Sequence, residues 1–392
     1  MLKYQLKKYL PPAVFHTLKK VYQQRALFHY WLPYVFSNGN AWPPTRLTLE
    51  ITFRCNQKCL MCPQATDIRK QDSQLLQRRQ VSSELTAPEI YSLADEVARM
   101  KIKEIGITGG EAFLRKDIIQ IIRYIKRRGL NCSVLSNGTL IDRETAAEIV
   151  AAKLNRITFS LDGPREIHDQ IRNVKNAFDN LMQSVSYIKE EKKKRNSVIP
   201  YLSFSSTISS INSGILSQLM AVAAEQELDI NFGYLFYTTD SMIQRTNEIF
   251  KMGDAKDEDQ DIADYLKKVD VGELEPEIEK IKQKEKTLGI KATFQPPLKG
   301  REIYRRFYDD SFSYTTKCFL PWYGVRVNPY GDVYPCSMNV LMGNIRNETL
   351  GSIWNNERYV GFRKSLKKNK LFPKCVKCCV LTNKLWSYLP GF

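Results

Sequence analysis

The chain has 392 residues, of which 43% are hydrophobic and 26% charged, a composition that excludes a disordered or fibrous protein. Its length exceeds that of most single hydrophobic cores, so we expect two domains. Its apolar runs stay shorter than the roughly 18 residues that a membrane-spanning helix needs, and its N-terminus lacks the features of a signal peptide.

The net charge of +17 is unevenly distributed along the chain. Residues 1–46 and 361–392 contain lysines and arginines but no Asp or Glu. Such blocks usually mark contact with something anionic. Solubility, together with the compensation of negatively charged metal–thiolate groups, explains them equally well.

Residues 1–46 form a basic, aromatic-rich segment ahead of the first predicted strand. Apolar residues recur in it at four-residue spacing, interrupted by Pro11 and Pro12: Leu2, Leu6, Leu10, Val14 and Leu18. Basic residues and aromatics together can bind a membrane surface, and residues 1–40 are the candidates for such contact. We favour the alternative that the segment covers an exposed side of the fold.

Between residues 47 and 237, short apolar strands alternate with helical segments. We predict strands over 47–53, 102–108, 132–136, 156–161, 201–208 and 230–236. We predict helices over 87–100, 117–128, 142–152, 177–194 and 214–227. This alternation is typical of a parallel β/α architecture. Because polar motifs follow the strands, as active-site residues do in barrels, we favour a partial (β/α)6 TIM-like barrel.

The rest of the chain divides into two parts. Residues 238–312 are polar and charged, and we predict a helical connector with helices over 258–269 and 277–286. Residues 313–392 carry the second group of cysteines and form a small C-terminal metal-binding domain. Cys132 belongs to neither cysteine group, and its place within a predicted strand indicates a buried structural thiol.

Cys55, Cys59 and Cys62 follow the first predicted strand in a C-x3-C-x2-C pattern. A loop with this spacing can place three thiolates around a 4Fe–4S cube, which normally takes four. One iron then keeps an open coordination position, where chemistry can take place. A zinc site would need a fourth ligand, and no further Cys or His lies near the loop in the sequence.

Short polar motifs stand at or just after the ends of the next three predicted strands. In chain order they are Gly109-Gly110-Glu111, Ser136-Asn137, Ser160 with Asp162, and then Arg172. Taken one at a time, ordinary turn chemistry explains them. Their common position at strand ends, in one consistent order, is much harder to explain as turns.

The cysteine loop and these motifs together resemble the radical S-adenosylmethionine (SAM) superfamily. The resemblance implies that SAM binds the open iron and is cleaved reductively to a 5′-deoxyadenosyl radical, which takes a hydrogen atom from the substrate. An oxygen-sensitive cluster also implies a reducing cytoplasm, with a flavodoxin- or ferredoxin-type protein as the electron donor. The motif residues would then hold SAM: Glu111 with Gly109 and Gly110 at its amino group, Ser136 and Asn137 at its ribose, Arg172 at its carboxylate, and Ser160 and Asp162 in the same site.

The C-terminal cysteines show a second pattern. Gly331 and Cys336 have the form G-x4-C, Cys318 precedes them, and Cys375-x2-Cys378 follows. This resembles the SPASM extension of radical SAM enzymes in its shortened "twitch" form. The resemblance implies one auxiliary 4Fe–4S cluster on Cys318, Cys336, Cys375 and Cys378, with Cys379 to spare, and a zinc site on the same residues is the alternative.

The substrate is the least determined part of the prediction. We favour a net oxidation of an anionic sugar or other small molecule, because the chain resembles dehydrogenases with a single auxiliary cluster. A ribosomally made peptide is the main alternative, although residues 1–46 are too few for a peptide-recognition domain. A non-catalytic electron-transfer protein would not need a SAM site. No nucleic-acid recognition motif accompanies the positive charge, so we expect no nucleic-acid partner.

Overall fold

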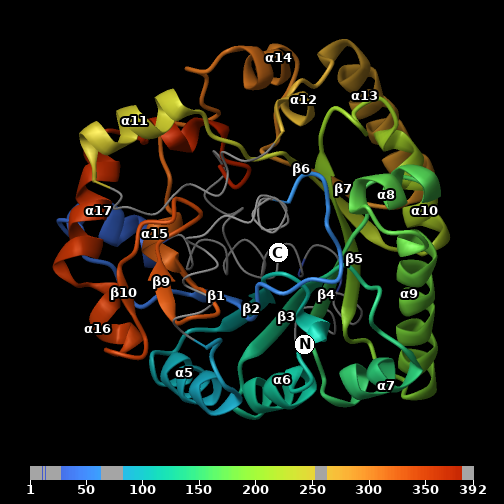
Figure 1. Ribbon diagram of the computed structural model, residues 1–392, viewed down its shortest axis with the longest axis horizontal. Helices are drawn as coiled ribbons and strands as arrows, with labels where there is room; N and C mark the ends of the chain where they lie inside the picture. Colours follow the sequence, from blue (N-terminus) through green and yellow to red (C-terminus); the bar gives the residue numbers. More distant parts are fainter. Residues whose placement is uncertain (1–10, 12–13, 15–27, 63–82, 252–262, 382–392) are drawn as a thin grey trace.

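The computed structural model describes residues 11, 14, 28–62, 83–251 and 263–381. Its frame is one ten-stranded sheet in the order β10-β9-β8-β1-β2-β3-β4-β5-β6-β7 (Figure 1). The strands from β8 to β7 in this order are parallel, whereas β9 and β10 pair antiparallel at one edge. The strands are β1 (Arg46–Glu50), β2 (Glu104–Thr108), β3 (Asn131–Ser136), β4 (Arg156–Ser160), β5 (Tyr201–Ile208), β6 (Asp229–Tyr234), β7 (Ala292–Gln295), β8 (Gly324–Val327), β9 (Asp332–Tyr334) and β10 (Gly343–Asn344).

Helices lie on the outer side of this curved sheet (Figure 1). Those of the barrel part are α5 (Ala87–Arg99), α6 (Ile118–Arg127), α7 (Arg143–Ala151), α8 (Arg165–Arg172), α9 (Ala177–Lys194) and α10 (Leu219–Glu225). Those that follow are α11 (Asp240–Ile249), α12 (Asp264–Lys267), α13 (Val271–Leu288), α14 (Arg301–Tyr308), α15 (Leu320–Tyr323), α16 (Leu350–Trp354) and α17 (Glu357–Lys368). The 3₁₀ turns are η1 (Ala112–Leu114), η2 (Leu216–Gln218) and η4 (Pro373–Lys377).

The predicted β/α alternation is confirmed, because β1 to β6 and the five predicted helices between them are all present, with ends that differ by a few residues. The last of these helices starts as the turn η2 and continues as α10. The short helix α8 was not predicted, because it is strongly polar and buries few of its residues.

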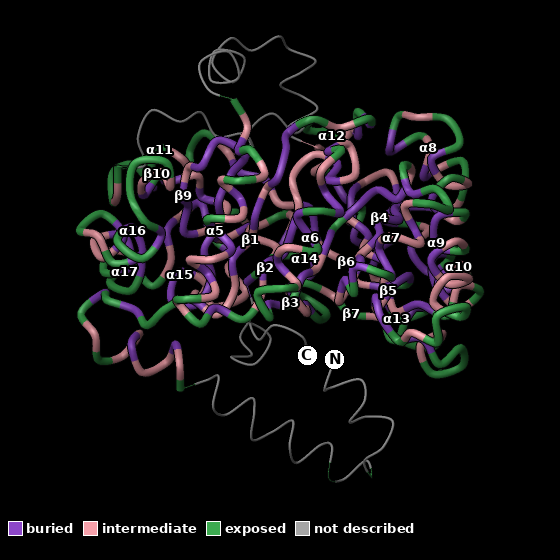
Figure 2. Tube along the Cα trace, turned by 90° about the horizontal axis from the view of Figure 1, so that it is seen from below, coloured by how far each residue is buried: buried purple, intermediate pink, exposed green. Residues whose placement is uncertain are grey.

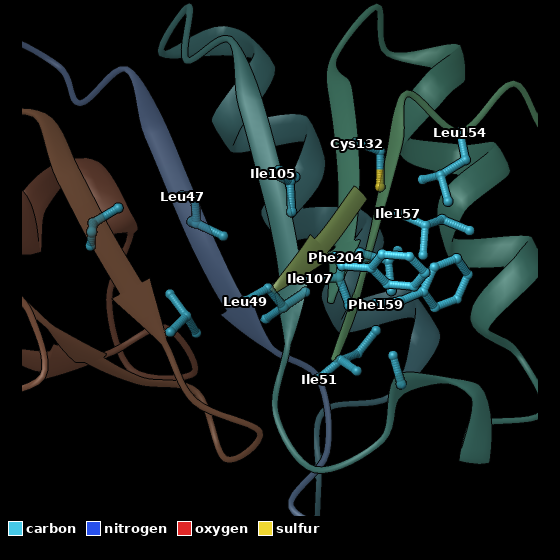
Figure 3. Close-up of a cluster of buried hydrophobic side chains, with 14 of the residues drawn as sticks. Leu47, Leu49, Ile51, Ile105, Ile107, Cys132, Leu154, Ile157, Phe159 and Phe204 are labelled. Atoms are coloured by element: carbon cyan, nitrogen blue, oxygen red, sulfur yellow. The ribbon is translucent and has the colours of Figure 1, made fainter. Parts of the chain in front are cut away.

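Alternating apolar residues place the core between the sheet and its helices. In β5 every second residue from Leu202 to Ile208 is buried, and α6 faces the sheet with a row of buried isoleucines. Figure 2 shows the buried parts of the trace concentrated along the strands. Cys132 lies within this core beside Leu154 and Ile157 and is fully buried, which confirms the prediction of a structural thiol (Figure 3).

The predicted connector contributes a strand that the sequence did not reveal. Residues Ala292–Gln295 form β7, which extends the parallel sheet beyond β6. Four residues with half-exposed side chains carry too little apolar pattern to be recognised as a strand. The predicted helix over 277–286 lies within α13, and that over 258–269 is described only from residue 263, where α12 forms.

The C-terminal part is built onto the same sheet as the barrel. Strand β8 pairs with β1 in parallel register from Arg46 opposite Gly324 to Leu49 opposite Val327. Arg326 also forms an ion pair with Glu50 across these two strands, at 3.0 Å. The edge of the barrel at β1 is therefore extended by the strands β8, β9 and β10 of the part that contains the second cysteine group.

The described part of the N-terminal segment also packs on the C-terminal part. Residues 28–36 are helical, and the side chain of Tyr30 is buried. The centroid of its ring lies 5.8 Å from that of Phe319 and 5.4 Å from that of Tyr323. This agrees with the favoured alternative that the segment covers the fold, while the apolar repeat over 2–18 lies mostly outside the described residues. Within the described residues, no helix is long and apolar enough to cross a membrane.

Replacement of Tyr30 tests whether this segment belongs to the core. Tyr30→Ala should lower the free energy of unfolding by about 3 kcal/mol, because a large buried aromatic side chain is lost. Phe36→Ala is the matched control, since Phe36 lies in the same helix and is 74% exposed. Anaerobic urea unfolding measures both variants, and an equal, small effect would mean that residues 28–36 contribute little to the core.

Candidate active site

The first cysteine loop is held by the loop that follows β2. After β1 the chain runs beside residues 108–111, with hydrogen bonds from Gly110 N to Thr52 O at 2.7 Å and from Glu111 N to Arg54 O at 2.8 Å. A Cβ atom on Gly109 would lie 2.3 Å from Thr52 O, and one on Gly110 would lie 2.1 Å from Arg54 O. The glycine pair is thus required for the close approach of two backbones, in addition to any approach by a ligand.

The three cysteines of this loop line one cavity of about 240 Å³. Of the predicted SAM-binding residues, Gly109, Gly110, Ser136, Asn137, Ser160 and Arg172 also line it. These side chains come from the ends of neighbouring parallel strands, where barrel active sites are built. The structure therefore brings together most of the site that the sequence predicted.

Further residues of the cavity were not predicted from the sequence: Phe53, Gln57, Met61, Thr108, Leu135 and Thr207. Thr108 and Thr207 lie at the ends of β2 and β5, so their position at strand ends was an available signal. The apolar members carried no such signal, because an apolar residue beside a strand is usually part of the core.

The surroundings of the thiols fit a 4Fe–4S cluster. Burial raises the pKa of Cys55 to about 11, so this side chain becomes a thiolate at neutral pH only when a bound metal cation displaces its proton. Gln57 is also buried at the cavity wall, and its Nε2 atom has no hydrogen-bond partner. Among the described residues, no three Cys, His, Asp or Glu side chains lie close enough to share one metal ion. A 4Fe–4S cluster does not need such a group, because each thiolate binds a different iron.

Glu111 is buried behind the cavity wall and is not among the residues that line it. Its carboxylate accepts hydrogen bonds from Ser136 Oγ at 2.8 Å, from Asn137 N at 2.7 Å and from Phe113 N at 3.1 Å. Burial raises the pKa of Glu111 although these bonds and Arg172 oppose the shift. The observed role of Glu111 is to join the ends of β2 and β3, and its contact with SAM stays a prediction.

Asp162 is likewise fully buried and does not line the cavity. Its carboxylate pairs with Arg172 and accepts a hydrogen bond from Thr207 N at 2.7 Å. Arg172 lines the cavity and its Nη1 lies 3.7 Å from Cys59 Sγ. Asp162 therefore acts through Arg172, which it holds beside the cluster loop.

Helix α8, which carries Arg172, is fixed at both ends. His168 is buried, and its Nδ1 accepts a hydrogen bond from Asp162 N at 3.2 Å. Burial, with a smaller effect of Arg172, lowers the pKa of His168 to about 3, so this side chain is neutral at physiological pH. At the other end, Leu60 N donates to Ile171 O at 2.9 Å and joins the cluster loop to the helix.

The second group of cysteines comes together from three elements: Cys318 precedes α15, Cys336 follows β9, and Cys375 lies in η4. Burial raises the pKa of Cys318 to about 12, with a further contribution from Cys336. Burial also raises the pKa of Cys375, and both of those thiols add to the shift. The pKa of Cys378 is raised by its neighbour Cys379, by burial and by Cys375. The predicted ligands therefore lie near one another, with Cys379 beside them.

Buried positive charges surround this cysteine group. Lys374 and Lys377 flank Cys375, and both are almost fully buried, as is Arg306 of α14. Lysine and arginine are rarely buried without a compensating negative charge. A cluster held by several thiolates is negatively charged, so these residues fit an iron–sulfur cluster at this position.

Residues 49–206 match the radical SAM superfamily, and residues 318–379 match SPASM, an iron–sulfur cluster-binding domain. The chain belongs to the radical SAM superfamily. This confirms the resemblance seen in the sequence and makes the protein a radical SAM enzyme with a C-terminal SPASM domain. The match also favours iron–sulfur over zinc chemistry for the second cysteine group.

Relatives of this radical SAM protein include enzymes of named function. AdoMet-dependent heme synthase of Methanosarcina barkeri (strain Fusaro / DSM 804) is 27% identical over 354 residues, which cover 86% of this chain and 88% of that protein. Fe-coproporphyrin III synthase of the same organism is 35% identical over 143 residues, which cover 36% of this chain and 33% of that relative. The second match therefore spans only about a third of the relative's length.

Solved structures share the fold. Streptococcus suis SuiB bound to S-adenosylmethionine superimposes with a TM-score of 0.59 at 14% identity, covering 87% of this chain and 72% of that one. Native anSMEcpe with bound AdoMet gives a TM-score of 0.53 at 16% identity, covering 81% and 82%. At such low identity these structures confirm the α/β fold of a partial barrel and carry no information on the substrate.

The pairing of Asp162 with Arg172 predicts an effect on SAM binding. Asp162→Asn should weaken SAM binding about ten- to a hundredfold, because a charged hydrogen bond is worth roughly 1.5–3 kcal/mol. Anaerobic equilibrium binding of SAM measures the loss, and the iron content should stay that of the wild type. Asp142→Asn, at the exposed start of α7, is the control. An unchanged SAM affinity at full iron content would exclude a positioning role for Asp162.

Proposed function

We propose that this protein is a radical SAM oxidoreductase that oxidises an anionic small molecule, a sugar or another compound, with one auxiliary 4Fe–4S cluster as electron acceptor. When bound at Cys55, Cys59 and Cys62, the first cluster supplies the electron that splits SAM into methionine and the 5′-deoxyadenosyl radical. A hydrogen atom then passes from the substrate to this radical. The substrate loses a further electron and a proton, so the net change is a two-electron oxidation.

The observation that supports this reaction type is the gathering of Cys318, Cys336, Cys375 and Cys378 among buried positive charges. Four thiolates complete the coordination of a 4Fe–4S cluster. Such a cluster has no open iron to bind a substrate, so electron acceptance is the simpler role. Four ligands leave one thiol over, and in this proposal Cys379 is the spare one.

The residues of the cavity have distinct tasks in this proposal. The guanidinium of Arg172 can hold the SAM carboxylate, since a planar fork suits a carboxylate geometrically. Ser136, Asn137 and Ser160 offer hydrogen-bonding groups at the wall where the SAM ribose would lie. Phe53 and Leu135 line the same cavity and help to keep water away from a reactive radical.

A small anionic substrate has more support than a peptide. The relative that covers most of this chain, at 27% identity, is named as a heme synthase, and heme is a small molecule. The peptide alternative has some support from PqqA peptide cyclase of Bradyrhizobium diazoefficiens, which is 24% identical over 38% of this chain. SuiB bound to the precursor peptide SuiA shares the fold, but it is only 13% identical.

The iron content of the anaerobically reconstituted protein tests the proposal. The wild type should hold about eight irons per chain, and Cys55→Ala/Cys59→Ala/Cys62→Ala should hold about four, because each cluster contributes four. The triple variant should also fail to cleave SAM when reduced flavodoxin or ferredoxin supplies electrons. Cys132→Ala is the control, since this buried thiol lies in the core and not at either cysteine group.

Two other results would decide against the proposal. About four irons with one zinc in the wild type would replace the auxiliary cluster by a zinc site, and the case for a net oxidation would go with it. Unchanged SAM cleavage by the triple variant would remove the assignment of the first cluster.

We also propose contact with an anionic membrane surface through the N-terminal segment. Phe28, Phe36 and Trp42 are 53%, 74% and 47% exposed, which is unusual for large aromatics so close in sequence. Lys367 lies next to this segment, with its Nζ donating a hydrogen bond to Val35 O at 3.0 Å. Exposed aromatic side chains together with basic ones are the features that bind a protein to anionic lipid.

Vesicle flotation tests this contact. The wild type should float with phosphatidylglycerol vesicles, and Phe36→Ser/Trp42→Ser should float several-fold less. Tyr265→Ser is the control, because Tyr265 is similarly exposed but lies on α12. Equal flotation of the wild type and the double variant would exclude the contact.

A further inference from the structure

Arg306 is a buried cation at the junction of the barrel and the second cysteine group. It belongs to α14 and is 1% exposed. Its Nη2 donates to Leu235 O at 2.9 Å and also to Lys377 O, and its Nη1 donates to Val376 O at 3.3 Å. Among the described residues it forms no ion pair with a carboxylate, and its Nε has no hydrogen-bond partner.

The backbone groups that bind Arg306 belong to the two cysteine loops or touch them. Val376 and Lys377 stand between Cys375 and Cys378 in the sequence. Leu235 follows β6 and packs with Leu60 and Met61, which stand between Cys59 and Cys62. The guanidinium group of Arg306 therefore joins the backbone between Cys375 and Cys378 to Leu235, whose apolar cluster supports the first cysteine loop.

The charge of Arg306 needs a negative partner. A buried charge without compensation is strongly unfavourable. The side chains of Tyr237, Cys379, Cys378 and Tyr234 lie within electrostatic range of Arg306. Lys377 adds a second positive charge, because it is fully buried and its Nζ donates to Arg306 O and to Asp309 O. Its carboxylate partner is the largely exposed Asp310, at 3.7 Å.

We propose that Arg306 is a positioning residue that neutralises the auxiliary cluster and holds its cysteine loop against the barrel. This rests on the proposed function, in which that cluster accepts an electron from the substrate. Electron uptake adds one negative charge to the cluster, and a fixed cation nearby stabilises the reduced form more than the oxidised form. Arg306 thus raises the reduction potential of the auxiliary cluster and favours electron transfer to it.

Two variants separate the charge from the hydrogen bonds. Arg306→Met removes both, whereas Arg306→Lys keeps the charge but loses the planar fork that reaches two loops at once. Arg305→Met is the matched control on the same helix, because Arg305 is 47% exposed and pairs with Asp309 at the surface. Loss of such an exposed pair has little effect on stability.

A redox titration of the anaerobically loaded holoenzyme, followed by electron paramagnetic resonance, tests the proposal. Arg306→Met should shift the auxiliary cluster to a lower midpoint potential and leave the potential of the first cluster nearly unchanged. Arg306→Lys should keep a potential near that of the wild type but unfold at a lower urea concentration, because the planar fork that binds two loops is lost. The Arg305→Met control should match the wild type in both respects.

The outcomes are distinguishable from those that test the proposed function. Equal auxiliary-cluster potentials in the wild type and Arg306→Met, with about eight irons in each, would overturn the inference and leave the proposed function standing. If Arg306→Met fails to retain its iron, Arg306→Gln takes its place, since it can still donate hydrogen bonds without the charge. A wild type with about four irons would overturn the proposed function, and the inference with it.

Discussion

The close approach of the backbone after β1 to the backbone after β2 is the constraint on which the site depends. It requires Gly109 and Gly110, because a side chain at either position would meet the carbonyl of Thr52 or Arg54. The approach places the first cysteine loop over the ends of the parallel strands. Glu111 then fixes the next strand end through Ser136 and Asn137, so that the cavity wall and the cysteine loop form one connected structure.

The second cysteine group depends on the same strand from its other side. Strand β8 pairs with β1, so β1 has one neighbour that leads to the SAM motifs and another that leads to the SPASM domain. Arg306 adds further contacts between these parts, and the described part of the N-terminal segment packs on the C-terminal one. Two cysteine groups that are far apart in the sequence are thus held next to strands of one continuous sheet.

The sequence predicted the barrel strands and most residues of the cavity, because alternation of apolar residues and motif order are local signals. It did not reveal β7, whose four partly exposed residues are too few for their alternation to be recognised, or the polar helix α8. It also grouped Glu111 and Asp162 with the residues that hold SAM. A carboxylate at a strand end has the same sequence context whether it faces a ligand or binds its neighbours, and only the fold shows that both carboxylates are buried and bonded to residues of the cavity wall.

The position of β1 has a consequence for the order of folding. Its partner β2 is made soon after it, but its partner β8 begins at Gly324, almost at the end of the chain. A strand without its neighbour exposes unpaired backbone groups and can pair wrongly with other chains. Contacts between residues so distant in sequence also form slowly. The edge at β1 therefore stays unpaired until the strands of the SPASM domain have been made.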